Sequence, residues 1–331
     1  MDATPPPPTK PKGGRPRDGV WADFDESTGK PRSCICTWCR IEMKSEPKRM
    51  IHHLASKCKE IDLAGRNKYL LRWNEMMSAG HDDDSGVPRK VQKISNKKRK
   101  ILISGGGFNS TYLKYVVALT GKARPRICFL PTAAGDSQDK IVQFYEDCAA
   151  LNVEPHVQLS FLSSAKQARD WDEVLLSMDA IVCSSGNTVN QQAIWKAHGL
   201  DEILKHAWDK GIILCGSGAG ALCWFEEGTT DSRPKRLSTV KCLGFLPGSH
   251  CPHYDSEPHR RPLYQKLIST GELKPGYACD DDAGIYFEDA EPIRAVTARA
   301  DAKVYYVSMV EGHVQEQLLP THSIDSNICT V

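Results

Sequence analysis

The stretch that most constrains the fold is Gly211–Phe225, which reads GIILCGSGAGALCWF. Its first part, 212–215, is a short apolar run typical of a strand that is buried on both faces. Three glycines follow at alternate positions, Gly216, Gly218 and Gly220, and glycine tolerates the backbone conformations of a sharp turn. We therefore predict a strand that turns abruptly into a helix, with Gly218 at the tip of the turn.

A strand, a sharp turn and a helix together form a nucleophile elbow. Such an elbow presents one side chain at the carboxyl edge of a parallel sheet and directs backbone N–H groups at a developing oxyanion. Gly218 has no side chain with which to attack a substrate. The alternative nucleophile is Ser217, in a register shifted by one that places Cys215 and Ala219 where the turn requires permissive glycines. Cys215 itself is a further, minor alternative.

Apolar runs alternate with helical stretches throughout the last two thirds of the chain. Helical stretches cover 139–151 and 189–208, and the runs are ILIS, ICFLP, HVQLSFL, AIVCS and IILCG. This alternation predicts an α/β domain with a doubly wound, mostly parallel sheet that is covered on both faces. Ligands bind at the carboxyl ends of such strands. Three glycine- and serine-rich loops follow predicted strands, at 104–107, at 184–188 and at the elbow.

These loops, in this order, resemble those of the dipeptidase E and cyanophycinase family of serine peptidases, whose elbow motif is G-x-S-A-G-A. At 216–221 five of six positions agree in type, and Gly218 replaces the serine. The resemblance covers nearly all of residues 100–320 and implies a class I glutamine amidotransferase-like or flavodoxin-like fold. It also implies that the N–H groups of Gly186 and Ala219 form the oxyanion hole, although Ser184 and Ser185 stand where the family usually has glycines.

The same resemblance assigns His253 as the catalytic base and Asp231 as the acid that orients it. A serine hydrolase needs an imidazole beside the nucleophile and a carboxylate that fixes its tautomer. The competing residues are His250 and His259 for the base, and Glu226 and Asp255 for the acid. The resemblance further implies a small Asp-containing peptide as substrate, which Arg260 and Arg261 are candidates to position.

Charge divides the chain into two parts with different partners. Residues 1–100 contain 22 Lys and Arg against 13 Asp and Glu, a net charge of +9, whereas the remainder carries −7. A basic segment suits a polyanion such as nucleic acid. The sequence has 13 cysteines but no secretory signal and no apolar run long enough to span a membrane, so we expect reduced thiols, one metal site and a nuclear or cytoplasmic location.

The metal site is predicted from four ligands in 20–60. Cys36 and Cys39 have C-x2-C spacing, and His53 and Cys58 follow as H-x4-C. Three thiolates and one imidazole suit a tetrahedral structural zinc, which would supply much of the folding free energy of so short a segment. The alternative ligands at these positions are Cys34 and His52.

With Trp21 and Phe24 ahead of the first cysteines and an HL doublet at His53, this segment resembles BED-type zinc fingers. The resemblance implies a small ββα finger that binds DNA. Four basic residues on or beside its helix are candidates to contact phosphates or bases: Lys44, Lys48, Arg49 and Lys57.

The remaining segments are a disordered basic arm at 1–19 and a linker at 61–99 that contains one helix, Asn67–Met77. The basic cluster 97–100 is interpreted either as a nuclear-import signal or as the solvated start of a strand. The peptidase-like domain then occupies 100–331. The sequence predicts a zinc-dependent DNA-binding protein whose peptidase domain is impaired by Gly218, and the alternative is an active serine peptidase that uses Ser217. A second copy of the chain is a further expected partner.

Overall fold

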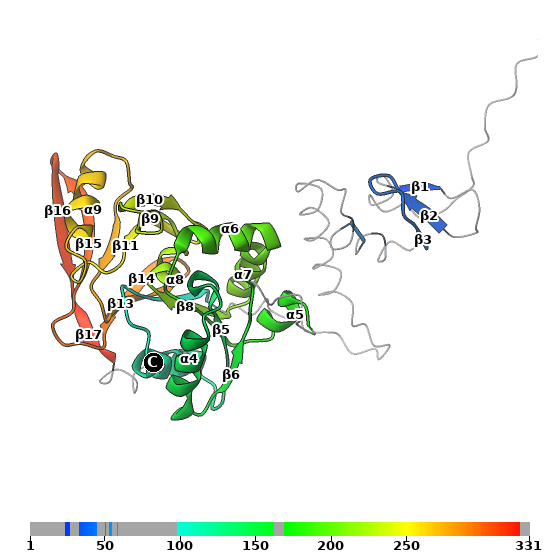
Figure 1. Cartoon of the computed structure of the whole chain (residues 1–331), viewed down its shortest axis with the longest axis horizontal. Helices are drawn as coiled ribbons and strands as arrows, with labels where there is room; N and C mark the ends of the chain where they lie inside the picture. Colours follow the sequence, from blue (N-terminus) through cyan, green and yellow to red (C-terminus); the bar gives the residue numbers. More distant parts are fainter. Residues whose placement is uncertain are drawn as a thin grey trace, which may run out of the picture. The chain divides into compact units, whose positions relative to one another are not determined.

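The computed structural model divides the chain into two compact units, Met1–Gln92 and Lys93–Val331 (Figure 1). It describes residues 24–26, 33–44, 50, 53, 54 and 58 of the first unit, and residues 98–161 and 169–324 of the second. The predicted basic arm, the anchor Trp21 and the linker helix Asn67–Met77 lie outside the described residues.

The first unit contains a three-stranded antiparallel sheet. Its strands, in the order β1-β2-β3, are β1 (Phe24–Glu26), β2 (Ser33–Cys36) and β3 (Glu42–Lys44). A tight turn joins β2 to β3, because Arg40 N–H donates to Cys36 O (2.9 Å) and Cys36 N–H donates to Ile41 O (3.0 Å). The C-x2-C pair therefore lies at a turn between two short strands, and β1 adds a third strand.

The second unit is built on an eight-stranded sheet in which five consecutive strands are parallel. The strand order is β17-β14-β13-β4-β8-β7-β5-β6. The parallel strands are β4 (Lys100–Ser104), β5 (Arg126–Leu130), β6 (Glu154–Val157), β7 (Ala180–Cys183) and β8 (Ile213–Ser217). The remaining three are β13 (Ala283–Glu288), β14 (Glu291–Thr297) and β17 (Thr321–Ser323). Four of the five predicted runs coincide with strands, whereas β6 begins at Glu154 and overlaps its predicted run, 156–162, only at 156–157.

The inner parallel strands β4, β8, β7 and β5 are buried on both faces, which explains why they are continuous apolar runs. Successive residues of a strand point to opposite faces. Ile101 and Ile103 therefore pack in one core cluster with Trp195 and Trp208, while Leu102 packs in the other with Tyr112. The sheet is thus covered on its two sides, as predicted.

Helices on one side are α3 (Ser110–Thr120) and α4 (Gln138–Ala149); on the other they are α5 (Trp171–Leu175), α6 (Thr188–His198) and α7 (Leu200–Asp209). The sequence predicted one helix over 189–208. The structure instead breaks it at Gly199, whose φ of 71° ends α6 in the left-handed conformation.

A second sheet of six strands packs beside the first and was not predicted (Figure 1). Its order is β10-β9-β11-β12-β15-β16. The strands are β9 (Phe225–Thr230), β10 (Ser238–Lys241), β11 (Leu246–Cys251), β12 (Gly276–Cys279), β15 (Val304–Val310) and β16 (His313–Leu319). Helix α9 (Arg260–Ser269) packs against it through Tyr264 and Leu267.

The order of four parallel strands explains where a ligand site is expected. Along the sheet, β6-β5-β7-β8 has the 2-1-3-4 order of a flavodoxin-like fold. The fifth place is taken by β4, which precedes the other four parallel strands along the chain. Chain connections reverse direction between β5 and β7. A crevice forms at such a reversal, so the loop that leaves β7 is a favoured ligand site.

The described part of the basic cluster is tied into the domain. Lys98 pairs with Glu288, Arg99 Nε lies 3.1 Å from Asp289 Oδ1, and Lys100 begins β4. These contacts favour the start of a strand over an import signal. Among the described residues, no helix is long and apolar enough to cross a membrane, and no described cysteine forms a disulfide.

Candidate active site and metal centre

The predicted elbow is present between β8 and the short helix α8 (Ala219–Leu222). Gly218 at its tip has φ 54° and ψ −115°, a conformation that side chains rarely adopt. The flanking glycines allow the turn to press against β7, because a Cβ on Gly220 would lie 2.1 Å from Cys183 O and one on Gly216 would lie 2.5 Å from the same atom. The glycine spacing is thus required by backbone contact.

His253 faces the elbow and is held by a carboxylate. Its Nδ1 lies 2.7 Å from Asp281 Oδ1. Because an ionised carboxylate only accepts hydrogen bonds, Nδ1 carries the proton and Nε2 is left as the basic atom. A Cβ built on Gly218 would lie 3.0 Å from this Nε2. The imidazole is therefore directed at the position from which an elbow side chain would attack.

The carboxylate that orients His253 is Asp281, and the prediction of Asp231 for this role is wrong. Asp231 is 62% exposed and pairs instead with Arg260, at 3.4 Å. The hydrogen bond from His253, opposed by partial burial, holds the pKa of Asp281 below its usual range. Asp281 begins the turn after β12, and Gly106 packs so closely that a Cβ there would lie 1.9 Å from Asp281 Oδ1.

The competing residues are placed elsewhere. His250 is fully buried in β11 and stacks on Phe225, and burial lowers its pKa to about 3. His259 is exposed at the N-cap of α9. Glu226 pairs with Lys274. Asp255 accepts a hydrogen bond from the Asp281 N–H at 2.9 Å, and so helps to hold the backbone of Asp281 in place.

The two predicted oxyanion donors line the same pocket as His253. The N–H groups of Gly186 and Ala219 make no hydrogen bond to another described residue. Gly186 has φ 139°, and a Cβ on it would lie 2.2 Å from Ala133 O. Only glycine fits there, and its N–H and that of the first residue of α8 can stabilise a developing negative charge.

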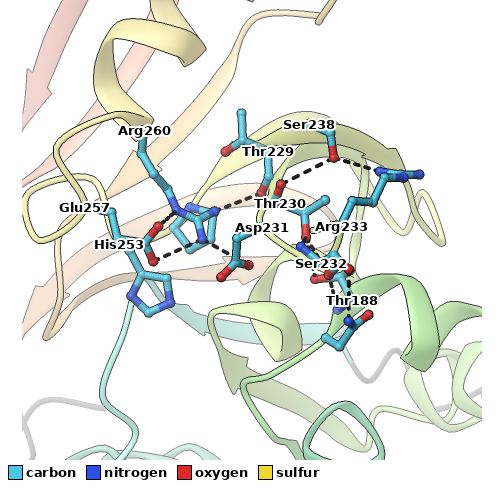
Figure 2. A network of polar contacts seen from close by, with 12 residues as sticks. Thr188, Thr229, Thr230, Asp231, Ser232, Arg233, Ser238, His253, Glu257 and Arg260 are labelled. Carbon is cyan, nitrogen blue, oxygen red and sulfur yellow. Dashed lines mark hydrogen bonds and ion pairs between the residues drawn. The ribbon is translucent and has the colours of Figure 1, made fainter. Parts of the chain in front are cut away.

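A pocket of about 230 Å³ opens beside the imidazole. Its far wall is polar (Figure 2), with a network in which Ser232 Oγ accepts from Thr188 N–H (2.8 Å) and contacts Thr230 Oγ1 (2.8 Å). Arg260 forms part of the lining, with only 3% of its side chain exposed, and its Nε donates to Glu257 (2.7 Å). The pocket therefore offers hydroxyls, one buried guanidinium and the exposed carboxylate of Asp231. Arg261 pairs instead with Glu316.

The displaced nucleophiles considered from sequence are poorly placed. Ser217 is only 6% exposed and lines a neighbouring pocket with Phe108 and Lys140, which does not include His253. Cys215 is fully buried within β8, and burial raises the pKa of its thiol well above the usual range.

Comparison with known proteins agrees with this geometry. The family model described as peptidase family S51 matches residues 101–294. The chain belongs to peptidase family S51. It is 44% identical over 229 residues to "Uncharacterized peptidase YgaJ" of Bacillus subtilis (strain 168), a match that covers 67% of this chain and 97% of that protein.

The fold of this S51 domain also resembles a solved structure, the "Crystal structure of a peptidase from an acI-B1 Actinobacterium". The TM-score is 0.53 at 15% sequence identity, and the match covers 68% of this chain and 96% of that one. This likeness supports the mostly parallel α/β architecture. The predicted relation to serine peptidases is thus confirmed for the second unit.

In the first unit, the structure brings together the four predicted metal ligands. Ligand atoms of Cys36, Cys39, His53 and Cys58 all lie within 4.8 Å of one another. Cys36 Sγ is 3.8 Å from Cys58 Sγ, and Cys39 Sγ is 3.2 Å from His53 Nε2. Two sulfurs about 2.3 Å from one tetrahedral zinc lie about 3.8 Å apart. The cluster therefore fits a zinc ion, which would cross-link the β2–β3 turn to the segment around His53.

The predicted DNA-contacting residues are described only in part. Lys44 is the last residue of β3 and so lies on a strand, not on a helix. Lys48, Arg49 and Lys57 lie outside the described residues. Sequence reasoning missed Asp281; its signal is the run of three aspartates, 280–282, directly after β12.

Proposed function

We propose that this protein binds DNA through a zinc-holding finger of the BED type in its first unit, and binds small Asp-containing peptides in the S51 domain. We further propose that hydrolysis cannot start from the elbow of that domain. The observation that carries the proposal is Gly218, which stands where a nucleophile would face His253 Nε2.

The loss of the elbow hydroxyl has a large expected cost. Removal of a triad nucleophile leaves only about 10³- to 10⁴-fold acceleration over water, supplied by the oxyanion hole and by binding. The S51 domain retains the parts that bind and polarise a substrate, namely the His253–Asp281 pair, the Gly186 and Ala219 N–H groups and the polar pocket. Binding is therefore expected to survive the loss of the elbow nucleophile.

The chemistry of the pocket favours a small peptide that carries both charges. Arg260 already pairs with Glu257 and Asp231, and it is the arginine that lines this pocket, so a substrate carboxylate would share its guanidinium with them. The exposed carboxylate of Asp231 is suited to a substrate amine. Calorimetry with the dipeptide Asp-Leu tests this proposal, with Asn-Leu as the matched ligand without the charge and with His253→Ala to prevent turnover. We expect affinity for Asp-Leu to be at least about 10-fold higher; equal affinities, or no binding, contradict the peptide proposal.

The DNA proposal is supported by the net charge of +9 in residues 1–100 and by the geometry of the Cys3His cluster. Bound zinc would hold the finger folded, and Lys44, Lys48, Arg49 and Lys57 would neutralise phosphates. We expect about one zinc per chain, and DNA affinity that falls with both salt and chelator.

A matched pair of variants tests which basic residues contact DNA. Lys48→Ala with Arg49→Ala should reduce the slope of log affinity against log salt by about 2. The control, Lys235→Ala with Arg236→Ala, makes the same charge change at exposed positions of the S51 domain. Equal slopes for the two double variants contradict the DNA proposal.

A further inference from the structure

The loop between β7 and α6 places a second hydroxyl at the elbow. Ser185 follows Ser184 directly after β7 and lines the pocket that also contains His253 and Ala219. It also lines the neighbouring pocket, so it stands on the ridge between the two. Its side chain is partly exposed and makes no hydrogen bond to another described residue.

The Ser185 hydroxyl lies where a side chain at position 218 would begin. A Cβ built there would lie 2.3 Å from Ser185 Oγ, 3.2 Å from Ser185 Cβ and 3.0 Å from His253 Nε2. Ser185 Oγ thus fills the space that an elbow side chain would occupy, and His253 Nε2 borders the same space. Since Ser185 Cβ is also close, rotation about χ1 moves the hydroxyl around this space without movement of the backbone. Contacts of a nucleophile with its base are often loose before substrate binds.

Oxyanion donors are arranged for a nucleophile at this position as well. In an elbow, the N–H of the residue after the nucleophile is one of the donors. The residue after Ser185 is Gly186, whose N–H donates no hydrogen bond to another described residue. Ala219, which lines the same pocket, supplies the second N–H. The same two N–H groups would serve a nucleophile at position 218 or at Ser185, and only the loop that carries the hydroxyl differs.

The geometry points to Ser185 as the catalytic nucleophile of the S51 domain, with His253 as its base and Asp281 as the residue that positions the imidazole. Ser185 Oγ attacks the carbonyl carbon of a peptide bond as its proton passes to His253 Nε2. The C–N bond then breaks, His253 returns the proton to the leaving amine, and an ester joins the acyl group to Ser185. Water attacks this ester, gives a proton to His253 and releases the acid, and His253 reprotonates Ser185 Oγ.

This inference rests on the proposed function for its pocket and its substrate, but a chemical probe tests it separately. The full chain is treated with a fluorophosphonate, which phosphonylates activated serine hydroxyls, and the modified residue is located by mass spectrometry. We expect the label on Ser185. Ser185→Ala and His253→Ala should each lower the labelling rate at least about 100-fold, whereas Ser217→Ala, which changes a serine of the neighbouring pocket, should leave it unchanged.

A second variant guards against an effect of Ser185→Ala on folding. Ser185→Cys should become the site alkylated fastest by iodoacetamide, and Asp281→Asn should slow that alkylation. Label on Ser217 or on no serine, or an undiminished rate in Ser185→Ala, overturns the inference. If Asp-Leu still binds in that case, the proposed peptide site stands alone; if Ser185 is labelled but Asp-Leu does not bind, the nucleophile stands and the proposed substrate fails.

Discussion

The elbow after β8 and the loop after β7 are adjacent and border the same space beside His253, but only the loop after β7 places a side chain there. Both leave adjacent parallel strands at the carboxyl edge of the sheet, and each contains a glycine with positive φ, Gly218 (54°) and Gly186 (139°). The elbow places bare backbone opposite the imidazole, whereas the other loop places the hydroxyl of Ser185 there. The comparison teaches that the turn of an elbow and the hydroxyl beside it can come from different loops.

The largest effect is expected from Asp281, whose carboxylate holds the imidazole that faces both loops. Asp281→Asn should lower the labelling rate of Ser185, and any turnover of Asp-Leu, by about 10⁴-fold, because an amide no longer fixes the tautomer that leaves Nε2 basic. Asp231→Asn is the matched change on the other side of the pocket and should alter the labelling rate by only a few fold. Equal losses for the two variants would show that the imidazole is oriented by something other than Asp281.

Exchange of the hydroxyl between the two loops is the most direct test of the comparison. In Gly218→Ser alone, the new Cβ would lie 2.3 Å from Ser185 Oγ, so the two side chains compete for one space. Gly218→Ser combined with Ser185→Gly removes this clash. We expect the double variant to carry the fluorophosphonate on the serine introduced at the elbow and to turn over Asp-Leu about 10²-fold faster than the single variant, since a misplacement of about 1 Å costs that much. A single variant as fast as the double one would refute the competition.

Because the backbones at the elbow pack closely, an added Cβ there should lower the free energy of unfolding. Gly220→Ala forces a Cβ to within 2.1 Å of Cys183 O, a backbone atom of β7, and should lower the free energy of unfolding of the S51 domain by about 3 kcal/mol. Gly121→Ala is the control, because that glycine ends α3 at φ 65° with open space around it; its cost should be about 1 kcal/mol. Urea denaturation measures both, and the prediction fails if Gly220→Ala is the milder change.

The smallest effect is the pH dependence of the His253–Asp281 pair. Because the folded-state pKa of Asp281 is lowered, its contribution to stability is present above the unfolded pKa of about 3.9 and is lost as pH falls through the folded value. The parent should therefore lose more stability than Asp281→Asn between about pH 5 and pH 2.5. Solvent reaches 24% of His253 and 34% of Asp281, which keeps the difference below about 1 kcal/mol. Parallel curves of urea midpoint against pH would argue against this pair.

Much of this architecture could be predicted from local patterns. Continuous apolar runs identified four of the five parallel strands because both faces of the sheet are buried there, whereas the half-buried β6 is shifted from its predicted run. The glycines of 216–220 identified the elbow because backbone contact excludes a Cβ at Gly216 and Gly220. The C-x2-C and H-x4-C spacings identified the four residues of the Cys3His cluster, whose ligand atoms lie within 4.8 Å of one another. Helix ends were less certain, and the break at Gly199 was missed.

The second sheet could not be predicted in the same way. Its strands are short, and only some alternate clearly; β16, for example, is mostly polar and at the edge. Their order joins segments separated by many residues, such as β12 with β15. Pairings of this kind depend on long-range contact and leave little trace in a local pattern.

The sequence by itself determined the inner strands of the sheet, the glycine turn of the elbow and the spacing of the Cys3His cluster, because each is a local pattern of residue size, polarity or spacing. The choice of His253 came from the family resemblance. Only the tertiary structure decided that Asp281 and not Asp231 holds the imidazole, and that Ser185 lies beside Gly218. Both pairs join residues that are distant along the chain, and their proximity depends on how β7, β8 and the turn after β12 meet at one edge.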